Sequence, residues 1–148
     1  MSTYTQIYYH IVFAAKNRQP VLVAERREEL FKYVWGIIKN QKSHLYRING
    51  AGDHLHLLVG LHPTVPLAQL VKDIKVSSSK WIKENRVFPK FEAWQDGYSA
   101  FTVGHGDKEG VIEYIKGQEE HHRKLSFNEE LKRFLTEAGI EFEEKWLP

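Results

Sequence analysis

The order of strand-like and helix-like segments constrains the fold of this chain more than any other feature of its sequence. Runs rich in β-branched and aromatic residues predict strands, and runs with apolar residues every three or four positions predict helices. The strands fall at 3–15, 44–50, 53–61 and 97–103, and the helices at 22–41 and 66–85. The second and third strands form a hairpin around Gly50–Gly52. This βαββαβ order predicts a ferredoxin-like (RRM-like) α+β fold with an antiparallel four-stranded sheet, in which the first and third strands are central.

The C-terminal third of the chain is predicted to be helical. The sequence GHGD breaks the chain at 104–107, and Asp107 is placed to cap a helix over 108–123. A last helix is predicted over 127–138. We therefore expect one domain over 1–148, with a core at 1–103, a hinge at 104–106, and a helical segment and tail at 107–148.

Composition excludes several classes of protein. The chain has 148 residues, of which 42% are hydrophobic and 27% charged, which suits a folded domain with a core. It has no cysteine, which excludes disulfides, zinc–thiolate sites and cysteine nucleophiles and fits a reducing cytoplasm. No apolar run approaches the roughly 20 residues of a membrane span, and the N-terminus reads as a strand rather than a signal peptide. We expect a cytoplasmic protein without a membrane partner.

Two histidines interrupt an apolar strand at residues 52–60, which read GDHLHLLVG. Because side chains alternate between the faces of a strand, His54 and His56 project together, while Leu55 and Leu57 are buried on the other face. Two imidazoles about 6–7 Å apart can converge on one divalent cation. The alternative interpretation is a pair of structural histidines.

A tyrosine and a glutamine lie four residues apart in EYIKGQEEHH, residues 113–122. On a helix, Tyr114 and Gln118 share one face. Gln118 offers a neutral amide oxygen to a hard cation, and Tyr114 offers a phenol that can form a covalent intermediate. Because a phenol has an ordinary pKa of about 10, a nearby cation or base must help it to ionise. The alternative is that Tyr114 packs and Gln118 faces water.

A third histidine lies on the first strand, which is predicted to neighbour the histidine strand. His10 can support the histidine pair from behind, or it can be an ordinary core or surface histidine.

The combination of these motifs resembles the single-tyrosine HUH transposases, in which U is a bulky apolar residue, Leu55 in this chain. It is most similar to the small TnpA-type enzymes of the insertion-sequence 200/605 group, and less similar to the REP-associated tyrosine transposases. The resemblance covers nearly the whole chain. It includes the segments YYHIVFAAKNR, GDHLHLLV, KVSSSKWI, GYSAFTVG and YIKGQ.

The resemblance implies a site and a reaction. His54, His56 and Gln118 would bind Mg²⁺ or Mn²⁺, and Tyr114 would attack a phosphate of single-stranded DNA at a hairpin-bearing element end. The product would be a 5′-phosphotyrosine with a free 3′-OH, so rejoining needs no nucleotide cofactor. Because one tyrosine holds one DNA end, the resemblance also implies a homodimer, with the tyrosine helix on its own or on its partner's histidines.

Charge distribution suggests where DNA binds. The net charge is only +2, but residues 72–90 are basic and residues 119–148 are acidic. Candidate phosphate contacts are Lys72, Lys75, Ser79 and Lys83 along one helix stripe, with Lys16 and Arg18 after the first strand. The alternative for the stripe is a solvated helix face.

Three other functions remain open at this point. A domesticated REP-type endonuclease would use the same chemistry. A replication or conjugation nickase of the HUH kind often has larger domains or two tyrosines. A non-catalytic RRM-like module would bind nucleic acid through aromatic side chains on an exposed sheet face.

Overall fold

The computed structural model describes residues 2–147, except for the side chain of His122. Its strands and helices run in the order β1 (Tyr8–Ala14), α1 (Arg27–Asn40), β2 (His44–Gly50), β3 (His54–Gly60), α2 (Leu67–Asn85), β4 (Ser99–Val103), α3 (Lys108–Lys116), α4 (Gln118–Lys124) and α5 (Phe127–Glu137). Short 3₁₀ turns occur at Lys16–Arg18, Ala24–Arg26, His105–Asp107 and Glu144–Trp146. The predicted βαββαβ order followed by helices is confirmed.

The four strands form one antiparallel sheet in the order β2-β3-β1-β4. The first and third strands are therefore the central pair, as the topology predicts. In their register Ala14 lies opposite His54 and Val12 lies opposite His56. These two side chains are buried beside the histidines and pack against α5.

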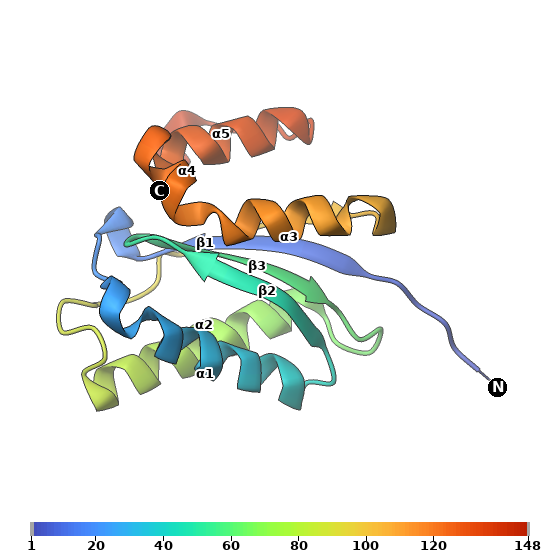
Figure 1. Ribbon diagram of the computed structural model, residues 1–148, viewed down its shortest axis with the longest axis horizontal. Helices are drawn as coiled ribbons and strands as arrows, with labels where there is room; N and C mark the ends of the chain where they lie inside the picture. The colour runs from blue at the N-terminus through green and yellow to red at the C-terminus, as the bar shows by residue number, and fades with distance from the viewer. Residues whose placement is uncertain (1, 148) are drawn as a thin grey trace.

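Helices cover both faces of the sheet (Figure 1). Helices α1 and α2 lie on one face, and α3, α4 and α5 lie on the other. The main core fills the α1–α2 side and includes Ile11 and Phe13 of β1 with Leu55 and Leu57 of β3. Side chains alternate along a strand, so the neighbouring residues on β1 and β3 face the C-terminal helices.

The β2–β3 hairpin depends on a glycine. A Cβ atom on Gly50 would lie 2.3 Å from the carbonyl oxygen of His54 and 2.8 Å from the side chain of Leu55. The Ala51 amide donates to the His54 carbonyl at 3.1 Å, which closes the turn. Strand β3 therefore begins at His54, directly after the turn of the hairpin.

A small apolar cluster holds α5 against the sheet. Val12 and Ala14 of β1 pack with Phe127, Leu131 and Leu135 of α5, and all five are buried. The helix begins with a serine N-cap, because the Ser126 hydroxyl accepts from the Glu129 amide at 3.2 Å and donates to the Glu129 carboxylate at 2.9 Å. The C-terminal layer thus has its own packing, separate from the main core.

The element boundaries differ from the prediction in two places. Strand β1 begins at Tyr8 rather than residue 3, and α1 begins at Arg27 after a 3₁₀ turn rather than at residue 22. The segment before β1 is exposed, as at Tyr4, which is 91% exposed, whereas Leu22 before α1 is buried in a non-helical segment.

The segment predicted as a hinge is extended only at Gly104, because His105 and Gly106 belong to a 3₁₀ turn. Gly104 has φ −75° and ψ 156°, and the Tyr8 hydroxyl lies 3.2 Å from Nδ1 of His105. Asp107 occupies the N-cap position of α3, but its side chain makes no capping hydrogen bond, so the predicted cap is wrong.

Among the residues that the structure describes, no helix is both long and apolar enough to cross a lipid bilayer.

The packing of β3 predicts a clear stability effect. Leu57 is 0% exposed in the main core. Replacing it by alanine should lower the free energy of unfolding by about 3 kcal/mol, because burial is lost and a cavity remains. Urea denaturation monitored by circular dichroism would measure this. The control Val76→Ala, at a position 60% exposed on α2, should change the value by less than about 0.5 kcal/mol. Equal effects of the two substitutions would contradict the assigned strand faces.

Candidate functional site

The two histidines of β3 lie side by side beneath the C-terminal helices. His54 is 1% exposed and His56 is 0% exposed, and their ring centroids are 5.1 Å apart. Leu55 and Leu57 belong to the core on the opposite face, as strand alternation predicts. The spacing of the motif therefore brings two imidazoles together at the centre of the sheet.

His54 is oriented by the residue before it. Its Nδ1 lies 2.7 Å from Oδ1 of Asp53, an acceptor that favours the tautomer with hydrogen on Nδ1. In that tautomer Nε2 carries a lone pair. Nε2 lies 3.0 Å from Oε1 of Gln118 and 3.5 Å from Oε1 of Glu130.

His56 connects two buried groups. Its Nε2 lies 2.8 Å from Oε1 of Glu130, and its Nδ1 lies 2.8 Å from Nε2 of His10. Burial lowers the pKa of His56, and burial followed by the charge of His56 lowers the pKa of His10 to about 3. Both imidazoles are therefore neutral near pH 7. His10, which is 3% exposed, supports the histidine pair from the neighbouring strand.

Glu130 joins the histidines to the tyrosine helix. The Tyr114 hydroxyl donates to Oε2 of Glu130, and Nε2 of Gln118 donates to the same oxygen at 3.2 Å. Burial alone would raise the pKa of Glu130, but hydrogen bonds from His56 and Tyr114 outweigh it and bring the value to about 2. Burial and the hydrogen bond to Glu130 raise the pKa of Tyr114 well above its ordinary value. The carboxylate is ionised and the phenol keeps its proton.

The predicted helix over 108–123 is two helices. It is interrupted at Gly117, which has φ −90° and ψ 17° and ends α3. Tyr114 therefore belongs to α3 and Gln118 begins α4. The two side chains still meet, because both donate to Glu130.

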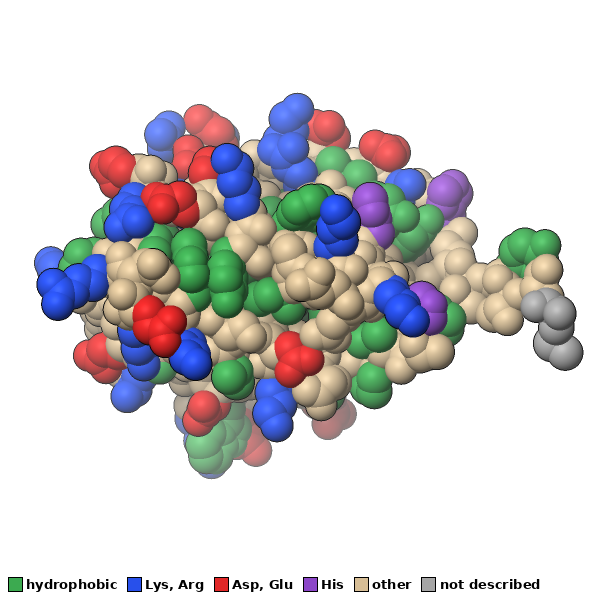
Figure 2. Space-filling view, turned by 90° about the horizontal axis from the view of Figure 1, so that it is seen from below, with side chains coloured by type: hydrophobic (Ala, Val, Ile, Leu, Met, Phe, Trp, Pro, Cys, Tyr) green, Lys and Arg blue, Asp and Glu red, His purple; other side chains and the backbone are tan. Residues whose placement is uncertain are grey.

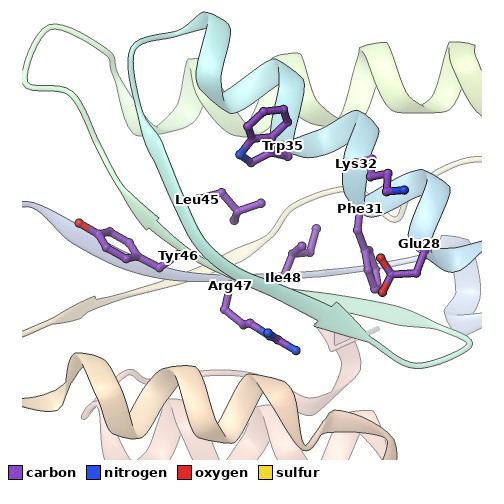
Figure 3. A pocket seen from close by; sticks show the side chains of 8 residues that line it. All are labelled: Glu28, Phe31, Lys32, Trp35, Leu45, Tyr46, Arg47 and Ile48. Carbon is purple, nitrogen blue, oxygen red and sulfur yellow. The ribbon is translucent and has the colours of Figure 1, made fainter.

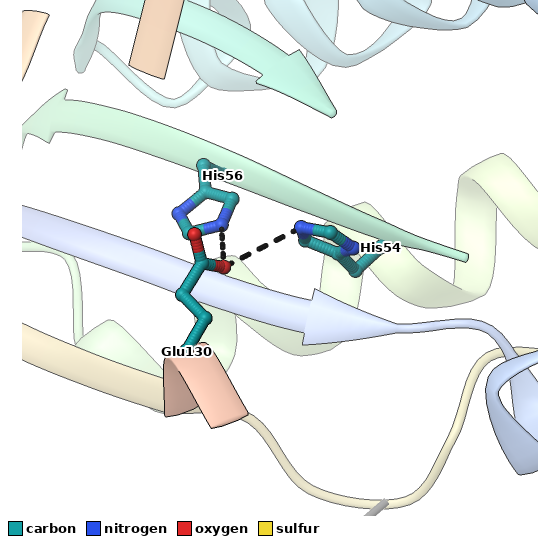
Figure 4. Close-up of side chains that lie close together, drawn as sticks. All are labelled: His54, His56 and Glu130. Atoms are coloured by element: carbon teal, nitrogen blue, oxygen red, sulfur yellow. Dashed lines mark hydrogen bonds and ion pairs between the residues drawn. The ribbon is translucent and has the colours of Figure 1, made fainter. Parts of the chain in front are cut away.

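Side-chain atoms that could ligate a metal ion converge above β3 (Figure 4). One nitrogen of each histidine and one oxygen of Glu130 lie within 4.8 Å of one another. With Nδ1 of His54 donating to Asp53, its Nε2 faces two oxygens that are also acceptors. A proton on Nε2 or a metal cation would satisfy this arrangement. The donor set of imidazole nitrogens, an amide oxygen and a carboxylate oxygen fits Mg²⁺ or Mn²⁺.

The sequence interpretation missed Glu130. Its signal is a carboxylate placed on the apolar stripe of α5, three residues after Phe127 and four before Phe134. A charged residue on the buried face of a helix needs a partner, because an unpaired buried charge is costly.

Aromatic rings enclose the site. The Phe127 ring stacks on His54 with centroids 4.5 Å apart. The Phe134 ring meets the rings of His10 at 5.2 Å, His56 at 6.3 Å and Tyr114 at 5.5 Å. These rings keep water away from the polar groups and strengthen the electrostatic interactions among them.

The predicted DNA-contacting residues occupy two different places. Lys16 and Arg18 are exposed on the turn after β1, next to the end of the sheet that carries His54. Lys72 and Lys83 are exposed on α2, on the other face of the sheet.

Two members of the α2 stripe are partly buried. The Lys75 ammonium donates to the carbonyls of Gln95 at 2.6 Å and Gly97 at 2.8 Å, and burial lowers its pKa. Ser79 is partly buried and lines a hollow of about 400 Å³ together with Lys75 and Lys83. Through these two hydrogen bonds, the Lys75 side chain stabilises the loop before β4.

A separate hollow of about 290 Å³ lies between α1 and β2 (Figure 3). Trp35 and Leu45 are among the residues that line it. It lies against α1, whereas the histidine pair faces the C-terminal helices on the opposite side of the sheet. It is therefore not part of the histidine site.

The family model for IS200-like transposases matches residues 3–118 of this chain. The chain belongs to this family. It is 28% identical over 120 residues to the transposase for insertion sequence element IS200 of Salmonella typhimurium, with 78% of each chain covered. It is 24% identical over 120 residues to the ISDra2 transposase TnpA of Deinococcus radiodurans, covering 76% of this chain and 84% of that protein.

Solved structures of transposases share the fold. A candidate transposase from Deinococcus radiodurans superposes with a TM-score of 0.63 at 24% identity, covering 80% of this chain and 95% of that one. A REP-associated tyrosine transposase bound to a REP hairpin superposes with a TM-score of 0.55 at 14% identity, covering 79% and 72%. The IS200-like match includes His54, His56, Tyr114 and Gln118 but ends before Glu130.

The buried histidines predict acid sensitivity in the metal-free protein. A histidine held neutral by the fold gains a proton on unfolding once the pH falls below its ordinary pKa of about 6.5. Stability should therefore fall as the pH drops from 6.5 toward 5, by up to about 1.4 kcal/mol per pH unit for His10, whose folded pKa is about 3, and the lowered pKa of His56 acts in the same direction. Glu130, whose pKa is lowered from its ordinary value of 4.5 to about 2, adds to the pH dependence only below about pH 4.5, where the stability that it contributes is lost.

Urea unfolding in EDTA between pH 7 and 5 would measure this slope. The variant His10→Gln should reduce the slope of the free energy of unfolding against pH by about 1.4 kcal/mol per pH unit, because it removes one histidine that the fold keeps neutral. The control His44→Gln, at an exposed position on β2, should leave the slope unchanged. A flat stability profile for the parent chain would contradict the assignment.

Proposed function

We propose that this IS200-like transposase cleaves and rejoins single-stranded DNA at hairpin-bearing element ends through a 5′-phosphotyrosine on Tyr114. The observation that carries the proposal is the meeting of Tyr114 and Gln118 with the histidine pair of β3. The Glu130 carboxylate accepts from Tyr114 and Gln118 through Oε2 and contacts His56 through Oε1. In this chain the tyrosine lies over its own histidines.

Tyr114 and Glu130 have different parts in the proposed cleavage step. The Tyr114 oxygen attacks phosphorus, the bond from phosphorus to the 3′-oxygen breaks, and the 3′-oxygen leaves to become a 3′-OH. Glu130 is the nearest acceptor for the phenol proton, because it already accepts the hydrogen bond. The tyrosine–phosphate bond conserves the free energy of the phosphodiester, so rejoining needs no nucleotide cofactor.

His54, His56 and Gln118 are the proposed ligands of Mg²⁺ or Mn²⁺. Such a cation, when bound, would polarise a non-bridging phosphate oxygen and neutralise charge that develops on phosphorus. Asp53 and His10 orient the two imidazoles through Nδ1 of each ring. This support fixes which nitrogen faces the cation.

Access for DNA requires a movement. His54, His56 and Gln118 are at most 1% exposed, so a phosphate cannot reach them in this arrangement. The segment 104–106 joins the sheet to α3, and its two glycines suit the change of backbone angles that an opening needs. We propose this segment as the hinge.

Excision joins two DNA ends, and one tyrosine holds one end. We therefore propose a homodimer that supplies two tyrosines. Opening at 104–106 would allow the α3–α4 segment to lie on its own histidines, as in this structure, or on those of the partner.

The proposed DNA surface begins at the turn after β1. Lys16 and Arg18 lie beside the histidine end of the sheet, so a strand entering the site would pass them. Lys72, Lys75, Ser79 and Lys83 lie on α2, where positive and negative side chains are interspersed (Figure 2). DNA that contacts both groups must pass around the edge of the sheet.

Two other functions carry less support. A domesticated REP-type endonuclease would share this site, and one structural neighbour is a REP-associated transposase bound to a REP hairpin. A non-catalytic RRM-like module needs an exposed sheet face. Here α3 and α5 cover that face, and its centre holds buried histidines.

Covalent capture tests the proposed reaction. A labelled single-stranded oligonucleotide that spans an element end should form an adduct with the protein in Mg²⁺ or Mn²⁺, visible on a denaturing gel. Tyr114→Phe and EDTA should each abolish the adduct, because the nucleophile or the cation is missing. The control Tyr33→Phe, on α1, should retain it. An adduct that survives Tyr114→Phe would show that another residue is the nucleophile.

Salt dependence tests the DNA surface. The double variant Lys16→Ala/Arg18→Ala should reduce the slope of log K against log salt concentration by about 1.4, since each phosphate contact to a single strand contributes about 0.7. Fluorescence anisotropy with a labelled oligonucleotide would measure the slope. The control Lys39→Ala/Lys42→Ala, at the opposite end of the sheet, should leave it unchanged. An unchanged slope in the first variant would remove the turn after β1 from the DNA surface.

A further inference from the structure

Glu130 is a buried acid on the apolar face of α5. It is 3% exposed and lies between Phe127 and Phe134, which contact the site histidines. Burying a carboxylate is costly unless charge-assisted hydrogen bonds or a cation compensate for the lost hydration. The position of Glu130 therefore needs a stronger reason than packing.

The carboxylate points into the space between the two imidazoles (Figure 4). Oε1 lies 2.8 Å from Nε2 of His56 and 3.5 Å from Nε2 of His54. Around a six-coordinate Mg²⁺, neighbouring ligand atoms are about 3 Å apart and opposite ones about 4.2 Å apart. The three ligand atoms, which lie within 4.8 Å of one another, need only small shifts to reach such positions.

We propose that Glu130 is an anionic ligand of the cation that His54 and His56 bind. The inference rests on the proposed function, and it adds to that function a ligand outside the segment that matches the family. With Gln118 as the only oxygen ligand from the protein, the site would keep the full double charge of the cation. Glu130 halves that charge and supplies the oxygen anion that Mg²⁺ and Mn²⁺ prefer.

The ligand set leaves space for substrate. His54, His56, Gln118 and Glu130 fill four of six positions around an octahedral cation, so two remain for a phosphate oxygen and water. The second oxygen, Oε2, meanwhile holds Tyr114 and Gln118. One carboxylate thereby ties the cation to the helix that carries the nucleophile.

A different role for the same carboxylate would give the opposite effect on binding. If Glu130 only fills the site in the absence of metal, it competes with the cation for the histidines, and its removal should tighten metal binding. The ligand role requires that its removal weakens binding.

Calorimetric titration of the full chain with Mn²⁺ distinguishes the two roles. Glu130→Gln keeps the shape of the side chain but removes its charge and replaces one acceptor oxygen by an NH₂ donor. It should raise the Kd for Mn²⁺ at least tenfold, as the loss of a metal-site group commonly does. Glu130→Asp, which keeps the charge but shortens the reach, should give a smaller increase. Far-UV circular dichroism establishes that each variant is folded.

The matched control is Glu129→Gln. Glu129 precedes Glu130 on α5 and is exposed, and the side-chain oxygen of glutamine can still accept from the Ser126 hydroxyl. This variant should bind Mn²⁺ like the parent chain. His56→Ala should bind far more weakly than the parent, because an imidazole ligand is lost.

The possible results distinguish failure of the ligand role of Glu130 from failure of the proposed function. Weaker binding in Glu130→Gln with normal binding in Glu129→Gln supports the ligand role. Unchanged or tighter binding in Glu130→Gln, with binding lost in His56→Ala, overturns the ligand role and leaves the proposed function intact. Absence of Mn²⁺ binding in the parent chain overturns both. If Glu130→Gln does not fold, the result for Glu130→Asp decides by the same criteria.

Discussion

Polar side chains from three segments of the chain meet over the middle of the sheet, and the position of the helix that carries Tyr114 depends on this meeting. The two imidazoles come from β3, the amide from α4 and the carboxylate from α5. Burying such groups is costly unless hydrogen bonds or a cation compensate, and Glu130 here accepts hydrogen bonds from Tyr114 and Gln118 and pairs with His56. Asp53 and His10 fix the imidazoles from the outside, so the inner atoms face one another. The arrangement therefore brings groups that could ligate a cation next to the Tyr114 phenol, as the proposed function requires.

The fold divides stability and function between the two faces of the sheet. The main core lies between the sheet and α1–α2, whereas a much smaller apolar cluster holds α5. Segments with little buried apolar area open at the lowest free-energy cost. Under the proposed function, we therefore expect the C-terminal layer, which covers the histidines, to open for DNA while the core remains folded. The proposed hinge lies where these two parts join.

Much of this fold was predictable because strand patterns are local. The alternation in β2 and β3 gave both strands within one residue, and it placed His54 and His56 on one face with Leu55 and Leu57 on the other. The break at Gly117 was not predictable, because a single glycine is tolerated inside a helix. The role of Glu130 was not predictable either. A glutamate in an amphipathic helix usually faces water, and only the docking of α5 on β1 brings this one to the histidines.

A crystal structure of the full chain with bound Mn²⁺ would test the central claim most directly. An anomalous difference map locates manganese independently of any activity. If the proposed cation site is correct, a peak should lie about 2.0–2.3 Å from Nε2 of both His54 and His56, with a Glu130 or Gln118 oxygen as a further ligand. A map with no peak between the two imidazoles, or with manganese bound only elsewhere on the chain, would contradict it.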